Sequence, residues 1–176
     1  MPDKQRLFFA LWPDAELQDQ IHQQLKHTVS QADGRWVVAA NLHITLAFIG
    51  LADAGLRECL VHAASQVQAN AFELQLSDLG FWRRPQVLWL GTEVSPPPLQ
   101  ELLAELNTHL STCGYQPDKR VFVPHMTFMR KVKRDIPTKN IQPFEWRVDR
   151  FVLVHSQSRP GGVHYEVIEQ WPLRRV

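Results

Sequence analysis

Two short stretches, His43-Ile-Thr-Leu46 and His125-Met-Thr-Phe128, decide how this sequence can fold, because both follow the pattern His-x-Thr-x. Polar and apolar residues alternate in each stretch. Successive side chains of a β-strand point to opposite faces, so each imidazole shares a face with the hydroxyl that follows it. The sequence therefore predicts two strands that each bury one face and offer a histidine and a threonine on the other.

The residues before the two motifs repeat one order of elements: an apolar strand, a proline, a helix and a glycine. The interval from Arg6 to His43 is 37 residues, and the interval from Val87 to His125 is 38 residues. A duplicated strand–helix–strand unit explains this agreement better than coincidence does. Apolar periodicity and turn residues predict strands at 6–12, 41–50, 72–79, 86–91, 121–128, 148–155 and 163–168, and helices after Asp14 and at 54–69 and 99–110.

Length and composition favour one compact domain. The chain has 176 residues, of which 44% are hydrophobic, enough for a substantial core. With the repeat, this predicts a single domain, 1–176, built from two duplicated lobes. The expected fold class is α+β, with two lobes related by a pseudo-twofold axis, each with an antiparallel sheet and helices, around a central groove.

The net charge of +1 excludes the dense basic surface of a protein that coats long nucleic acids, but not a site for one phosphate. The charge is unevenly spread. Residues 1–88 carry 7 Lys and Arg against 9 Asp and Glu, whereas residues 89–176 carry 12 against 9. The excess gathers at Arg130, Lys131, Lys133 and Arg134, which form either a solvated loop or a rim that receives a polyanion.

The paired motifs fit phosphodiester chemistry. Imidazole titrates near pH 6.5, so a pair can hold one proton donor and one acceptor at neutral pH. Threonine hydroxyls and a nearby cation can donate to phosphate oxygens. Zinc is the alternative for His43 and His125, but neither motif has a carboxylate or a cysteine two to four residues away. The other six histidines follow no repeated pattern and receive no chemical role.

The two motifs differ five residues after each histidine, where the first has Phe48 and the second has Arg130. A cation and an aromatic ring could hold a phosphate and stack on a base. Core packing is the alternative for Phe48, and a solvated surface position is the alternative for Arg130. Strict alternation would turn Arg130 away from His125, so the second strand must end or bend after Phe128.

The remaining features favour a cytoplasmic protein, which is expected to act as a monomer. Cys59 and Cys113 lie 54 residues apart without a metal-binding pattern, which predicts two buried thiols. No apolar run reaches the roughly 18 residues that a membrane span needs. The residues after Met1 lack a cleavage pattern for a signal peptide.

With these flanks, the paired motifs resemble those of the 2H phosphoesterase superfamily and, within it, the bacterial RNA 2′,3′-cyclic phosphodiesterases, also called 2′-5′ RNA ligases. The resemblance extends over nearly the whole chain, at 6–10, 43–50, 124–130 and 153–156, with Gly162 and Tyr165. It implies a bilobal α+β fold and the hydrolysis of terminal 2′,3′-cyclic phosphates to 2′-phosphates without a metal or a cofactor. It also implies reversible 2′-5′ ligation of RNA ends at the same site.

The resemblance also implies roles for residues. His43 would donate a proton to the leaving O3′, and His125 would accept one from water. Thr45, Thr127 and Arg130 would bind the phosphate. RNA ends that carry a cyclic phosphate, tRNA fragments among them, would be the partners. Two alternatives stay open: a non-catalytic module that binds RNA ends or nucleotides, and a phosphodiesterase for a small cyclic or 2′-5′-linked nucleotide.

Overall fold

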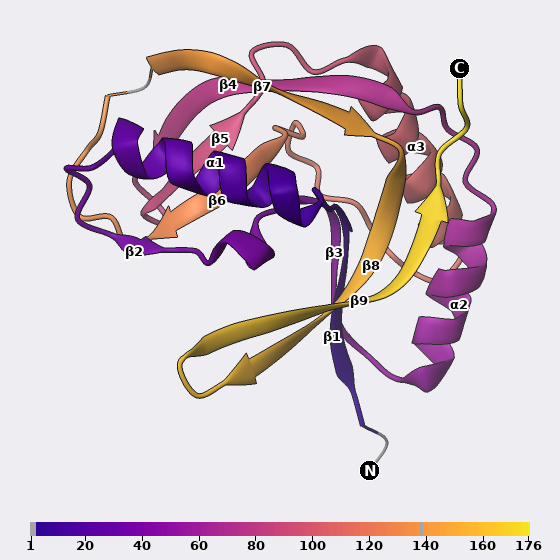
Figure 1. Cartoon of the computed structure of the whole chain (residues 1–176). Helices are drawn as coiled ribbons and strands as arrows, with labels where there is room; N and C mark the ends of the chain where they lie inside the picture. The colour runs from indigo at the N-terminus through magenta and orange to yellow at the C-terminus, as the bar shows by residue number, and fades with distance from the viewer. Residues whose placement is uncertain (1–2, 138) are drawn as a thin grey trace.

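A computed structural model describes residues 3–137 and 139–176 as an α+β fold with two antiparallel sheets (Figure 1). The four-stranded sheet has the order β3 (Ile44–Ala52), β1 (Gln5–Leu11), β8 (Arg150–Arg159) and β9 (Gly162–Pro172). The five-stranded sheet has the order β2 (Arg35–Trp36), β6 (His125–Arg130), β5 (Val87–Gly91), β4 (Phe72–Trp82) and β7 (Lys139–Val148). The expected fold class is confirmed. Each motif strand pairs with the first strand of its own repeat unit, β3 with β1 and β6 with β5.

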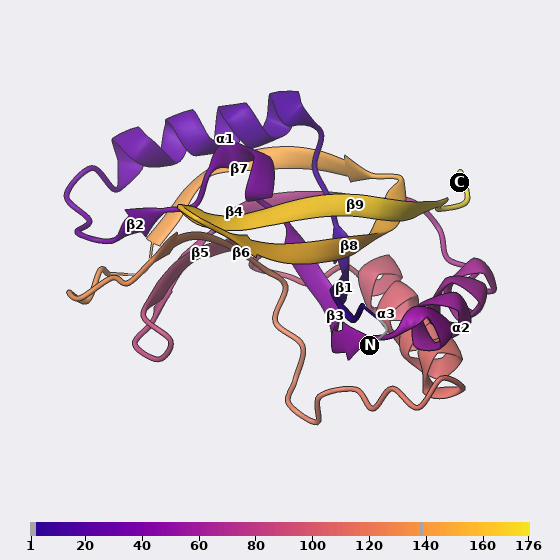
Figure 2. The same cartoon turned by 90° about the horizontal axis from the view of Figure 1, so that it is seen from below.

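Three helices pack on these sheets. They are α1 (Ala15–Thr28), α2 (Ala54–Ser65) and α3 (Pro97–Ser111), and a 3-10 turn at Ala39–Asn41 precedes β3. Asp14 begins α1, as predicted, by accepting a hydrogen bond from the Leu17 backbone N–H. Both views show α1 lying over the five-stranded sheet, with α2 and α3 side by side at the far end (Figures 1 and 2).

Strand β1 serves two packed layers because its side chains alternate between faces. Leu7, Phe9 and Leu11 are fully buried in the main core between the sheets and helices. Phe8 and Ala10 point the other way and pack with β8 in a second, smaller cluster that includes Trp12 and Tyr165 at its edge. The rings of Phe8, Trp12 and Tyr165 in this cluster contact the ring of His43.

Several element boundaries differ from those expected. The strand expected at 41–50 begins only at Ile44 because the 3-10 turn occupies residues 39–41, and the helix expected at 54–69 ends at Ser65. The strand expected at 121–128 begins at His125. Strand β7 was not predicted; its Pro143 obscures the pattern, yet an edge strand tolerates proline.

The prediction of two buried thiols is wrong. Cys59 of α2 and Cys113, just after α3, form a disulfide, and both residues are only partly buried. Their separation of 54 residues in the sequence carries no information about the side-by-side packing of the two helices, which brings the sulfur atoms together. None of the helices in the described part of the chain has the length and hydropathy needed to cross a membrane.

Candidate active site

His43 lies between the 3-10 turn and β3, with both ring nitrogens engaged. Nδ1 is 2.6 Å from the carbonyl oxygen of Asn41, and Nε2 is 3.2 Å from Oγ1 of Thr45. A carbonyl oxygen only accepts, so Nδ1 carries the hydrogen and donates it. In the neutral ring Nε2 is then the basic nitrogen, held beside the threonine hydroxyl.

Three aromatic rings enclose the His43 imidazole. Trp12 stacks on it at a centroid distance of 5.0 Å and an interplanar angle of 10°. Phe8 lies at 5.0 Å, and Tyr165 meets it edge-on at 5.2 Å. The loss of solvation caused by this burial lowers the His43 pKa from its usual 6.5 to about 4, although the Asn41 hydrogen bond opposes the shift.

His125 repeats the arrangement in the other half. It is the first residue of β6. Its Nδ1 is 2.8 Å from the carbonyl oxygen of Val123, two residues earlier in the chain, just as Nδ1 of His43 contacts the carbonyl oxygen of Asn41. Trp82 meets the His125 ring at 4.5 Å and 68°. Burial lowers the His125 pKa, with a smaller opposing effect from the Val123 hydrogen bond. Each imidazole is thus anchored through Nδ1, so Nε2 is the nitrogen that can meet a ligand, and in His43 this nitrogen also contacts Oγ1 of Thr45.

Trp82 itself rests on a second tryptophan, at a ring distance of 5.1 Å from Trp89. Trp89 lies opposite Gly80 and Thr127 on neighbouring strands. A Cβ on Gly80 would overlap the Trp89 indole, so this position requires glycine. Nothing in the spacing of these tryptophans relates them to the histidine motif, so neither was predicted to lie at the site.

A β-bulge lies at the last residue of each motif. In β3 the pairing with β1 skips Leu46, and in β6 the pairing with β5 skips Phe128. The next residue in each strand, Ala47 or Met129, is buried together with the skipped one. A bulge inserts one extra residue and so reverses the alternation that follows.

The bulges return Phe48 and Arg130 to the faces that carry the histidines and threonines. The predicted bend after Phe128 is therefore confirmed, although β6 continues through it to Arg130. Phe48 is 57% exposed, so the alternative that it packs in the core is wrong. We call His43, Thr45, Phe48, His125, Thr127 and Arg130 the motif face.

The two halves of the motif face lie close enough to interact. Strand β3 of one sheet lies against β6 of the other. The positive charges of Arg130 and His125 each lower the pKa of His43, and Arg130 also lowers that of His125. The fold thus brings the two sequence motifs together at one site.

Only some of the cationic side chains that follow the second motif are available to bind an anion. Asp33 accepts a hydrogen bond from the Lys133 backbone N–H and forms a 3.5 Å ion pair with Arg134. These contacts lower the pKa of Asp33, chiefly through the Lys133 N–H. Arg130 and Lys131 make no ion pair with a carboxylate of residues 3–137 or 139–176.

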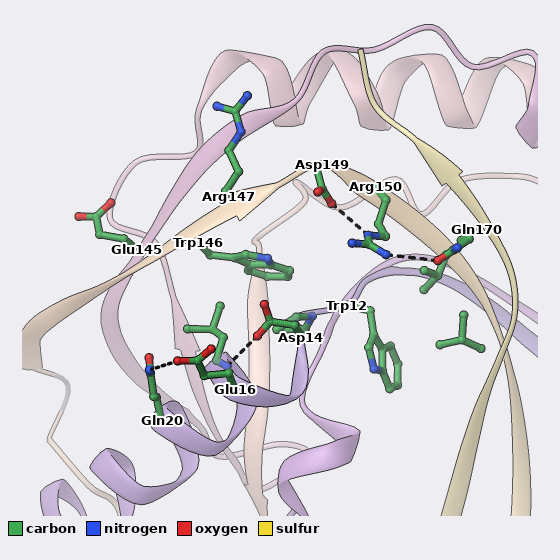
Figure 3. A pocket seen from close by; sticks show the side chains of 14 residues that line it. Trp12, Asp14, Glu16, Gln20, Glu145, Trp146, Arg147, Asp149, Arg150 and Gln170 are labelled. Carbon is green, nitrogen blue, oxygen red and sulfur yellow. Dashed lines mark hydrogen bonds and ion pairs between the residues drawn. The ribbon is translucent and has the colours of Figure 1, made fainter. Parts of the chain in front are cut away.

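A pocket of about 560 Å³ (Figure 3) has no residue of the motif face in its lining. Its lining comes from the start of α1 and from β7, β8 and β9, and includes Glu16, Trp146 and Arg150. Trp12 is the link, because it lines the pocket and also stacks on His43. Within the described residues, no three His, Cys, Asp or Glu side chains are grouped so as to hold a metal ion.

Comparison with known proteins gives consistent results. Residues 11–160 match the family model of the 2′-5′ RNA ligase superfamily. The RNA 2′,3′-cyclic phosphodiesterase of Escherichia coli is 35% identical over 178 residues, covering 98% of this chain and 99% of that protein. The protein of the same name from Thermotoga maritima is 30% identical, with coverages of 93% and 92%. The crystal structure of E. coli LigT complexed with 3′-AMP superposes with a TM-score of 0.85 at 35% identity, covering 97% of this chain and 99% of that one.

Proposed function

Since this chain belongs to the 2′-5′ RNA ligase superfamily, we propose that it hydrolyses 2′,3′-cyclic phosphates at RNA ends to 2′-phosphates. The observation that carries the proposal is the matched pair of imidazoles. Both are anchored through Nδ1 to a carbonyl two residues earlier, and both leave Nε2 for the reaction. A site that only binds RNA ends has no need for two such groups.

In the proposed reaction, water attacks the phosphorus while its proton passes to Nε2 of His125. The bond from phosphorus to O3′ breaks, and O3′ takes a proton from Nε2 of His43. Thr45, Thr127 and Arg130 donate hydrogen bonds to the non-bridging oxygens, where charge accumulates. The same steps, with a 5′-hydroxyl in place of water as the attacking group, form a 2′-5′ linkage, and their reversal cleaves it.

The low pKa of His43 constrains this mechanism. At about 4, the free imidazole is neutral at pH 7, whereas a proton donor must be charged. The negative charge of the bound phosphodiester favours the imidazolium and raises the pKa in the complex. Substrate binding therefore supplies the proton-donor state of His43.

The pH dependence of kcat/KM follows from these values. This constant reports the free enzyme, in which both imidazoles have a pKa below 6.5. The plot of kcat/KM against pH is therefore bell-shaped. It rises as the imidazole of lower pKa loses its proton, and it falls as the other imidazole loses its proton. We expect its maximum below pH 6.5 and the maximum of kcat at a higher pH, because bound phosphate raises both pKa values. Steady-state rates from pH 3.5 to 9 measure both curves, and a kcat/KM maximum above pH 7 contradicts the burial argument.

The direct test of the function uses a defined oligonucleotide with a 2′,3′-cyclic phosphate, incubated with the protein in EDTA. We expect full conversion to a 2′-phosphate. A 3′-phosphate product contradicts the assignment of the leaving oxygen, and loss of activity in EDTA contradicts a metal-free mechanism. Binding without any product identifies the chain as a recognition module instead.

Phe48 is the proposed platform for the terminal base, because its ring is exposed on the motif face. Base–aromatic stacking contributes roughly 1–3 kcal/mol, so Phe48→Ala should raise KM about 10-fold. Phe48→Tyr keeps the ring and serves as the control. Rates on the four nucleoside 2′,3′-cyclic phosphates measure the effect, and unchanged values in Phe48→Ala contradict stacking.

The matching bulges also support a proposal on organisation: the chain is a single domain built from two duplicated lobes. A single chain supplies both motifs, so we propose that the enzyme acts as a monomer.

The proposed location of the protein is the cytoplasm, and tRNA fragments are among its proposed substrates. The Cys59–Cys113 disulfide joins residues outside the motif face, so the chemistry does not depend on it.

A further inference from the structure

Arg35 stands directly opposite Arg130 on paired strands. Strand β2 pairs with β6 so that Arg35 faces Arg130 and Trp36 faces Met129. Side chains directly opposite each other in an antiparallel pair lie on the same face. Trp36 turns to the other side, where its ring is 5.8 Å from that of Phe128. Arg35 therefore shares a face with Arg130 and extends the motif face by one strand.

This arrangement of like charges is unfavourable unless an anion is bound. Like charges directly opposite in a sheet destabilise it. Neither arginine forms an ion pair within the described part of the chain. Asp33, only two residues before Arg35, is engaged by Lys133 and Arg134 instead.

Other contacts hold Arg35 in place at the end of the site. One guanidinium nitrogen, Nη2, donates a 2.9 Å hydrogen bond to the Gly161 carbonyl at the turn between β8 and β9. Asn41 donates a second bond, of 3.1 Å, to the Val163 carbonyl of the same hairpin. A guanidinium has five N–H donors, so most of those of Arg35 are left for a ligand.

Arg35 and Arg130 differ in their relation to the histidines. The charge of Arg130 lowers the pKa of both imidazoles, whereas Arg35 contributes to neither shift. Arg130 thus lies nearer the two imidazoles, and Arg35 lies farther out along the same face, on the edge strand β2. In an RNA strand the nearest anion beyond a terminal cyclic phosphate is the phosphodiester on the 5′ side of the same ribose.

We propose that Arg35 binds this penultimate phosphodiester, so that the preferred substrate is an oligonucleotide rather than a free nucleoside 2′,3′-cyclic phosphate. The inference rests on the proposed function and adds a second phosphate subsite to it. A charge-assisted hydrogen bond from arginine to phosphate fixes the position of the strand as well as its affinity. The terminal nucleotide is then held at both of its phosphates.

The test compares three substrates: a nucleoside 2′,3′-cyclic phosphate, a dinucleotide ending in one, and the same dinucleotide with an uncharged methylphosphonate linkage. For the wild type we expect kcat/KM on the charged dinucleotide to exceed that on the methylphosphonate by roughly 10-fold. Arg35→Ala should lose the same factor on the charged dinucleotide and show no difference between the two dinucleotides. Its kcat/KM on the mononucleotide should stay unchanged.

Arg147→Ala is the matched control, because Arg147 lies on β7 at the opposite edge of the same sheet and pairs with Glu73. It should behave as the wild type does on all three substrates. An equal loss on mononucleotide and dinucleotide in Arg35→Ala shows that Arg35 only supports the β8–β9 turn and overturns the proposal. Equal wild-type rates on the charged and methylphosphonate dinucleotides overturn it without any variant. Failure of the wild type to hydrolyse any of the three substrates contradicts the proposed function instead.

Discussion

His43→Ala and His125→Ala are each expected to lower kcat by roughly 100- to 10,000-fold, the contribution of a positioned general acid or base. Each substitution removes the imidazole assigned to one of the two proton transfers. The kcat of the double variant should be only slightly below that of the less active single variant, because the two groups act in one concerted step. Single-turnover rates on a cyclic-phosphate oligonucleotide measure these losses.

His27→Ala is the control for these variants, because His27 is exposed in the last turn of α1 and outside the motif face. It should retain full activity. Unfolding curves for the wild type and the four variants show whether the fold is preserved. Binding of the product shows whether the phosphate site is intact. Activity within 10-fold of the wild type in either motif variant, with its fold intact, contradicts two-histidine catalysis.

Local sequence pattern was sufficient to find the motif strands and their histidines. Alternation put His43 and Thr45 on one face, and the repeated interval pointed to a second copy at His125. These features are local, so they need no knowledge of which strands are neighbours. The helix that follows Asp14 was predicted for the same reason, from a capping residue and apolar periodicity.

The features that tune the site depend on contacts between distant segments. Trp12 and Tyr165, which enclose His43, lie 153 residues apart in the sequence and meet only because β1 pairs with β8 and β8 with β9. Arg35 reaches Arg130 through a two-residue strand that carries almost no sequence signal. The bulge was only partly foreseen: a bend was required, but its type depends on the pairing with β5.

Arg130→Ala tests the bulge and the electrostatics of the site together. Loss of one donor to the developing charge on phosphate should lower kcat/KM roughly 100-fold. The same change removes a positive charge that lowers the pKa of His43 and of His125, so both pKa values should rise and the kcat/KM maximum should move to higher pH. Arg130→Lys keeps the charge and should leave the maximum in place while recovering part of the rate. Arg134→Ala, which removes a neighbouring cation that Asp33 already pairs, should change neither quantity. A loss of rate in Arg130→Ala without a shift of the pH maximum would place its guanidinium away from the imidazoles, which requires β6 to run without its bulge.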